Sequence, residues 1–200
     1  MAGPFGMTHQ HDLRDSAQRQ TQCHPYLRHG AGFWKDGWWE LHCDLVLKNA
    51  PEFCPEGRIA NDPIYRLMEK YWMLQQLPWA VLCFVLGGLP WVIWGISARV
   101  AISVTGHWLI GYFAHNRGDR DWHVQEVAVQ GYNLPLAAYL TMGESWHNNH
   151  HAFPGSAKLG LKENQPDPGW WVLTVMQRLG LAWSIRLPKD LPTRSEVVPI

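Results

Sequence analysis

Three histidines lie close together in the sequence, at His147, His150 and His151. In an α-helix, steps of three and four residues return side chains to one face, so these imidazoles would project within an arc of about 100°. Imidazole is a common ligand for iron and zinc. The spacing therefore predicts a metal site on one helix. The polar neighbours that could hold the rings or bound water are Glu144, Asn148 and Asn149.

Two other interpretations of the triplet differ in class. The triplet could also be a surface cluster of histidines that binds nothing. Against this, an uncharged run that contains His115 precedes the triplet, and ionisable groups at the ends of membrane spans are candidates for function. A zinc hydrolase needs an acid that activates water near the ligands. Glu144 is available for that role, but the sequence contains no HExxH motif.

Two apolar runs precede the triplet, and they must position it. Residues 71–98 carry no formal charge, and a second uncharged run covers residues 100–116. A bilayer core of about 30 Å needs roughly 20 apolar helical residues, and spanning helices tolerate prolines. The runs predict a transmembrane hairpin over residues 74–115. The alternative is a buried hairpin in a soluble protein.

The flanks of this hairpin set its expected orientation. Lys and Arg occur before and after it, which favours the cytosolic side for both ends. The histidines near His11 and those near His147 would then share the cytosolic face of an integral membrane protein. Residues 1–22 are polar and contain no secretory signal peptide. The basic flanking residues are Arg66, Lys70, Arg117 and Arg120.

The remaining segments predict further helices. Residues 134–146 have helical character interrupted at Gly143, and we expect them at the membrane surface. A last helix would be capped by Asp167, begin at Pro168 and end before Gly180. The expected fold class is all-α: a membrane helical hairpin with a cytosolic helical cap, in a single domain over residues 1–200.

Composition excludes some partners and sites. Seventeen basic residues balance seventeen acidic ones among 200, so no overall charge attracts nucleic acid. The four cysteines are scattered without a CxxC pair, which argues against a disulfide framework or a cysteine zinc site. Thirteen tryptophans favour a boundary between lipid and water.

The segment Gly143 to Pro154, GESWHNNHHAFP, resembles the third histidine box of membrane fatty-acid desaturases. The resemblance is to the bacterial acyl-CoA desaturase group related to stearoyl-CoA desaturase, and it covers roughly residues 8–188. It implies a membrane helical bundle with a cytosolic cap and a non-haem di-iron centre. It also implies molecular oxygen, a fatty acyl substrate, membrane lipid and an external electron-transfer protein or reductase.

The resemblance assigns metal ligands residue by residue. His147, His150 and His151 match the third box, and His115 matches the ligand just after a membrane span. In many relatives an asparagine four residues before that histidine helps to hold iron through water. Gly111 stands there in this chain, so that contact is missing.

The second histidine box matches only in part. His11 matches its first histidine, while Arg14 and Asp15 stand where the paired histidines would be. A carboxylate can bind iron, whereas a guanidinium cannot. His24 follows at a position where relatives carry a histidine, and we expect a structural role for it. The first box is absent, which indicates a fragment or a truncated product.

Removal of hydrogen from an unactivated methylene needs an oxygen-activating metal instead of an acid–base triad. The expected function is oxygen-dependent desaturation of a long-chain fatty acyl group, carried on CoA or on lipid. A non-catalytic paralogue, a truncated desaturase and a membrane di-iron hydroxylase are the alternatives. Two irons need more ligands than these candidates supply, so we expect the isolated chain to bind at most one iron or zinc.

Overall fold

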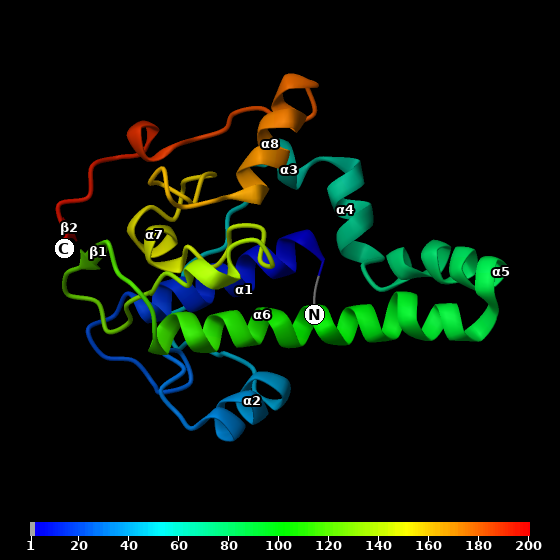
Figure 1. Cartoon of the computed structure of the whole chain (residues 1–200), viewed down its shortest axis with the longest axis horizontal. Helices are drawn as coiled ribbons and strands as arrows, with labels where there is room; N and C mark the ends of the chain where they lie inside the picture. The colour runs from blue at the N-terminus through cyan, green and yellow to red at the C-terminus, as the bar shows by residue number, and fades with distance from the viewer. Residues whose placement is uncertain (1–2) are drawn as a thin grey trace. The chain divides into compact units, whose positions relative to one another are not determined.

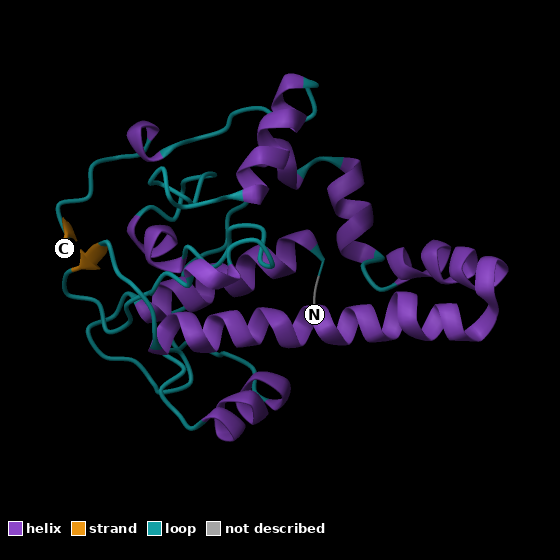
Figure 2. Cartoon of the chain, viewed as in Figure 1, coloured by secondary structure: helices purple, strands orange, loops and turns teal. Residues whose placement is uncertain are grey.

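The computed structural model describes residues 3–200, and most of its regular structure is helical (Figures 1 and 2). The longer helices are α1 (Pro4–Gln18), α2 (Phe33–His42), α4 (Pro63–Lys70), α5 (Leu77–Val92), α6 (Arg99–Asn116) and α8 (Pro168–Arg178). The shorter helical segments are α3 (Gly57–Ala60), η1 (Leu74–Gln76), η2 (Ile93–Ala98), η3 (Pro135–Ala137), α7 (His147–Ala152) and η4 (Pro188–Asp190). The predicted all-α class is confirmed.

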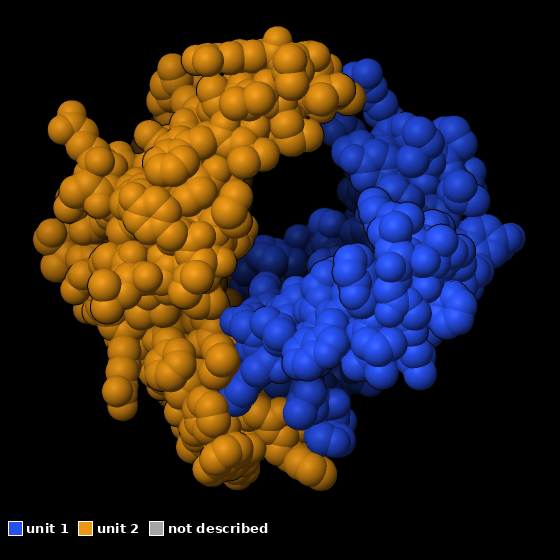
Figure 3. Space-filling view, turned by 45° about the vertical axis from the view of Figure 1, so that its right-hand side comes forward, with its two compact units in different colours: residues 1–17, 40–108 blue, residues 18–39, 109–200 orange. Residues whose placement is uncertain are grey.

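One small sheet accompanies the helices. Strand β1 (Trp122–Val124) pairs antiparallel with β2 (Val197–Pro199), with His123 opposite Val198. The chain divides into two compact units, which Figure 3 colours separately. The first comprises residues 1–17 and 40–108, and the second comprises residues 18–39 and 109–200. The single-domain organisation stays a prediction.

In the first unit, polar side chains fix the ends of the helices. Asp62 caps α4, because its carboxylate accepts hydrogen bonds from the backbone N–H groups of Ile64 and Tyr65. The Glu69 carboxylate near the end of α4 accepts from the backbone N–H of Phe5 at 2.8 Å, at the start of α1. In both cases a carboxylate accepts from backbone N–H groups that the first turn of a helix leaves unpaired.

The apolar run of the first unit folds back on itself at two glycines. Gly88 has φ 68° and ψ −161°, a region that only glycine adopts without strain. After this break, Arg99 donates to the Gln76 side chain at 2.5 Å, and a Cβ at Gly95 would lie 2.9 Å from Cys83 Sγ. The break therefore separates two packed legs, whereas the sequence placed it near Arg99.

The two legs differ in length. Residues 74–86 rise about 20 Å and residues 89–116 about 42 Å at the helical rise per residue. Within the described residues, Leu74–Asn116 is the one helical segment that is long and apolar enough to cross a membrane, and none of its most apolar window is buried. Only the second leg exceeds the roughly 30 Å of a bilayer core. That this segment crosses a membrane stays a prediction.

The second unit is organised around buried polar side chains. Asn133, Asn148 and Asn149 are almost fully buried, beside the apolar Trp146 and Ala152. Buried amides are costly unless they are hydrogen-bonded, so a core of this kind specifies particular partners.

Two expectations about the second unit meet different outcomes. Helix α8 begins as predicted, with the Asp167 carboxylate accepting from the N–H of Trp170 at 2.9 Å. Asp167 also accepts from Leu159 and Gly160, so the cap ties a loop to the helix. For residues 134–146 we expected helical character interrupted at Gly143. The backbone is helical only at η3 and then forms successive turns, and Met142 and Gly143 take positive φ at the expected interruption.

Candidate metal centre

Helix α7 carries the histidine triplet, and two asparagines between the histidines anchor it. Asn148 Oδ1 accepts from the N–H groups of Asp121 and Trp122, both at 2.8 Å. Its Nδ2 donates to the carbonyls of Trp122 and Gly131, both at 2.9 Å. A helix this short is not stable alone. Asn148 therefore fixes α7 against β1 and the loop before η3.

Asn149 anchors α7 to a second set of groups. Its Nδ2 donates to the Leu159 carbonyl at 2.7 Å and to Gln165 Oε1 at 2.8 Å. Asn133 accepts from the backbone N–H of Asn148 at 3.0 Å, so the start of the helix is also held. The sequence suggested that the two asparagines hold imidazoles or water. The structure instead shows them bonded to backbone and amide groups of the surrounding loops.

Three histidine nitrogens converge between α6 and α7. His115 Nε2 lies 3.1 Å from His147 Nε2, which lies 3.2 Å from His151 Nε2. One ligand atom from each of the three lies within 4.8 Å of the others. All three residues belong to the second unit. The histidines His147 and His151 of α7 therefore lie beside His115 at the end of the apolar run, as predicted.

The separations suit ligands of one cation. A metal–imidazole bond is about 2.0–2.1 Å, which places neighbouring nitrogens on one ion about 3.0–3.4 Å apart. The two distances at His147 fall in this interval. A single ring proton on His147 Nε2 cannot serve both neighbouring nitrogens, whereas a cation accepts all three lone pairs. The donor set of three imidazoles fits iron or zinc.

Outer contacts orient the rings. His115 Nδ1 donates to the Gln130 carbonyl at 3.3 Å, which leaves its Nε2 lone pair directed toward His147. Gly131 follows directly, and a Cβ there would lie 2.7 Å from both the His147 carbonyl oxygen and His151 Cδ2. Only glycine allows this backbone to approach the rings so closely.

The electrostatics favour the neutral form of His147. Burial, and then the neighbouring rings of His151, His115, His150 and His29, hold the pKa of His147 well below its usual range. A neutral imidazole is the form that binds a metal ion. The geometry and the charge state therefore favour the same role.

The other two predicted ligands, His11 and His150, are not members of this group of three. His150 lies on α7, with its ring centroid 5.8 Å from that of His147. His11 lies on α1 in the first unit, one helical turn before Asp15. Arg14 forms an ion pair of 2.9 Å with Glu40. Assignment of His11 and His150 to a metal stays a prediction.

Sequence reasoning missed two groups that lie beside the centre. His29 and Asp36 form a buried pair, with His29 Nδ1 2.7 Å from Asp36 Oδ2. Arg194 Nη1 donates to the carbonyls of His151 and Ala152 at the end of α7. No spacing in the sequence relates these residues to the triplet. The signal that the sequence offered for His29 was Gly111. A glycine leaves room beside it for the side chain of another residue, and His29 takes up that room.

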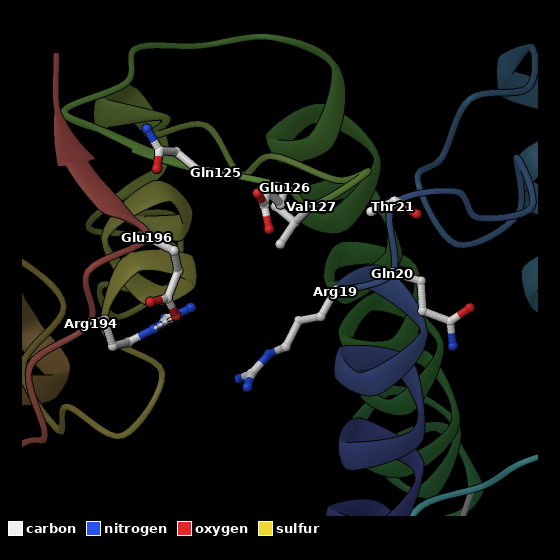
Figure 4. A pocket seen from close by; sticks show the side chains of 8 residues that line it. All are labelled: Arg19, Gln20, Thr21, Gln125, Glu126, Val127, Arg194 and Glu196. Atoms are coloured by element: carbon white, nitrogen blue, oxygen red, sulfur yellow. Dashed lines mark hydrogen bonds and ion pairs between the residues drawn. The ribbon is translucent and has the colours of Figure 1, made fainter.

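Figure 4 shows a separate pocket in the second unit, on which Arg194 borders. Arg194 pairs with Glu196 at 2.8 Å, and this hydrogen bond holds the pKa of Glu196 below its usual range. Arg19 and Glu126 also line the pocket. Basic and acidic groups alternate there, so we assign the pocket no chemistry and regard Arg194 as a support for α7.

A family model described as fatty acid desaturase matches residues 7–166, which include all five predicted metal ligands. The chain belongs to the fatty acid desaturase family. The Delta-9 desaturase-like 2 protein of Arabidopsis thaliana is 37% identical over 168 residues, which are 84% of this chain and 55% of that protein. The sn-2 palmitoyl-lipid 9-desaturase of Nostoc sp. is 34% identical over 155 residues, or 73% of this chain and 53% of that protein.

A further relative is the Acyl-CoA C20 Delta5-desaturase of Anemone leveillei, 29% identical over 164 residues. The match covers 82% of this chain and 52% of that desaturase. This chain thus spans about half the length of the curated relatives it matches. No solved structure matches this chain. The resemblance to desaturases is confirmed.

Proposed function

We propose that this chain forms part of an oxygen-dependent, iron-containing desaturase that acts on a long-chain fatty acyl group. The observation that carries the proposal is the convergence of His115, His147 and His151 in a chain of this family. Relatives are named for acyl-CoA and for acyl-lipid desaturation. The substrate would accordingly be an acyl chain carried on CoA or on lipid, and an external electron-transfer protein or reductase would supply electrons.

His115, His147 and His151 would hold an iron ion, which supplies the oxygen chemistry needed to remove hydrogen from a methylene. The chain's own contribution is positioning. Asn148 and the Gln130 carbonyl hold two elements so that their imidazoles face one point. Such preorganisation keeps the ligand geometry fixed while substrate and oxygen exchange.

The proposed second metal position is incomplete in this chain. We assign His11 to it, with Asp15 as a further oxygen ligand one turn along α1, and we assign His150 to the first position with the other histidines of α7. No first histidine box occurs in the sequence. We therefore propose that this chain alone binds one metal ion, and that desaturation by a two-iron centre belongs to a protein containing the additional ligands.

One observation favours a non-catalytic paralogue as the second candidate. Arg14 takes the place of a second-box histidine, and its guanidinium pairs with Glu40 instead of offering a ligand nitrogen. A membrane hydroxylase would use the same histidines, and product analysis separates it from a desaturase.

We also propose an integral membrane protein with the histidine centre on the cytosolic face. The support is the long, uncovered apolar segment that ends at Asn116, directly after His115. Basic residues at Arg117 and Arg120 follow it, as expected for a cytosolic flank.

The function is tested by expressing the protein in a host whose acyl chains are then analysed, beside a version extended with its upstream coding region. We expect new double bonds with the extended protein, loss of product with His151→Ala, and unchanged product with the exposed His24→Ala. Hydroxylated acyl chains would identify a hydroxylase. Absence of any product from the extended protein, supplied with oxygen and reductase, would support the non-catalytic alternative.

A further inference from the structure

His29 is a buried histidine that the proposed ligand set does not use. It is 2% exposed, and its carboxylate partner Asp36 is 1% exposed. His29 Nδ1 lies 2.7 Å from Asp36 Oδ2. A carboxylate only accepts hydrogen bonds, so Nδ1 carries the proton and Nε2 presents a lone pair in the neutral ring. This carboxylate–histidine arrangement is typical around metal sites.

The ring of His29 lies against Gly111, one helical turn before His115 on α6. A Cβ at Gly111 would lie 3.2 Å from His29 Nε2 and 3.6 Å from its Cε1. The His29 ring is nearly parallel to that of His115, with centroids 5.3 Å apart and planes 15° apart. His29 therefore occupies the space that a side chain at residue 111 would take, next to a proposed metal ligand.

The backbone around His29 is also fixed to α6. Asn116 Nδ2 donates to the His29 carbonyl oxygen at 2.9 Å, and the Tyr112 ring meets the His29 ring edge-on. His29 itself has a positive φ of 49°, an unfavourable conformation for a residue that is not glycine. Such a conformation persists where surrounding contacts over-determine it. The position of this ring is therefore set from several sides.

We propose that His29, oriented by Asp36, is a fourth histidine of the metal centre and serves it from the outer sphere, by accepting a hydrogen bond from a water ligand of the ion. This inference rests on the proposed metal-binding function of His115, His147 and His151. His29 is a positioning residue: it does not belong to the group of three whose nitrogens lie within 4.8 Å. In this chain it takes the place of the side chain that Gly111 lacks.

The first test measures binding of cobalt(II) to the detergent-purified full chain, by competition with a chromophoric chelator and by the visible spectrum. We expect His29→Ala to weaken binding about 10- to 100-fold and to shift the cobalt absorption bands. His24→Ala is the matched control, because His24 is an exposed histidine on the same loop. Unchanged affinity and an unchanged spectrum in His29→Ala would overturn the proposal.

The second test moves the proposed role from the side chain of residue 29 to a side chain at residue 111. Gly111→Asn alone should weaken cobalt binding, because its Cβ crowds the fixed His29 ring. Combined with His29→Ala, the asparagine amide has room to serve the water ligand, and we expect affinity above that of His29→Ala alone. A double variant no better than His29→Ala would contradict the proposal.

The free energy of unfolding without metal shows whether His29 positions the metal centre or only packs beside it. Each variant is unfolded with denaturant in the absence of metal. Recovery of cobalt affinity and of the wild-type spectrum in the double variant, beyond any recovery in stability, supports the proposal. Changes in affinity that only follow stability count against it. Failure of the underlying metal site gives a different result: the wild-type chain would then bind cobalt no more tightly than His147→Ala.

Discussion

His115 Nε2 and His147 Nε2 lie 3.1 Å apart, although 32 positions separate these residues in the chain. One stands at the end of the long apolar helix and the other at the start of a six-residue helix. Their approach depends on contacts made by neither ring. The asparagines of α7 bond it to the surrounding loops, and the backbone at Gly131 approaches His147 and His151 closely. Each of these contacts can be tested separately.

Gly131→Ala should disturb the centre without removing a ligand. The added Cβ would meet the His147 carbonyl oxygen and the His151 ring at 2.7 Å, and a backbone carbonyl cannot move aside easily. We expect a loss of about 1–3 kcal/mol in the free energy of unfolding, together with weaker metal binding. Gly106→Ala is the control, because its Cβ would meet nothing within 4 Å. Equal behaviour of the two variants would refute this role of Gly131.

Asn148→Ala should be strongly destabilising. The amide satisfies four backbone groups: the N–H of Asp121, the N–H and the carbonyl of Trp122, and the carbonyl of Gly131. Leaving buried groups unpaired costs about 1–3 kcal/mol each, so we expect a loss of at least ~2 kcal/mol. Denaturant unfolding measures it, with the exposed Asn164→Ala as control. A loss below that of Asn164→Ala would show that water replaces the amide.

The pKa of His147 predicts a pH dependence of the metal-free protein. Burial and neighbouring rings lower this pKa below the usual value near 6.5, so the unfolded chain takes up the proton first as the pH falls. Stability should therefore decrease from about pH 6.5 downward, by at most about 1.4 kcal/mol per pH unit from this group.

The matched variant for the pH experiment is His147→Gln, which keeps a polar side chain but does not titrate. Unfolding curves between pH 8 and 5 should show a shallower decline for this variant than for the wild type. Identical slopes would mean that His147 does not contribute to the acid sensitivity.

The apolar segment predicts tight membrane association. We expect the chain to remain in the membrane pellet after carbonate extraction, because Leu74–Asn116 is apolar and uncovered. A single cysteine placed at the exposed Leu86, beside the break between the legs, in a chain whose native cysteines are replaced, reports whether that break is shielded from aqueous thiol reagents. Recovery of the wild-type chain in the soluble fraction would contradict the membrane prediction.

Local sequence rules predicted the elements that depend on local physics. The three- and four-residue steps of the histidines, the Asp167 cap and the uncharged run all act through spacing or composition, and the corresponding helices are present. Residues 134–146 differ. Gly143 interrupts them as expected, with positive φ, but the residues before it form only η3 and turns, although their composition permits a longer helix.

The partners of the site required the fold. Asn148 and Asn149 are ordinary polar residues in the sequence, and only the tertiary structure shows which backbone groups they satisfy. His29 gave no signal by spacing, since it lies far from both Gly111 and His115 in the chain. The uncharged run does not reveal the break at Gly88, because that break follows from a φ/ψ pair that composition does not show.

Metal content of the detergent-purified chain tests the central claim most directly. After loading with iron(II) or zinc and removal of excess metal, we predict one ion per chain in the wild type, with loss of that ion in His115→Ala, His147→Ala and His151→Ala. His24→Ala should retain it. A wild-type chain that binds no metal, or variants that keep their full content, would contradict the assignment of these three histidines as ligands of one metal ion.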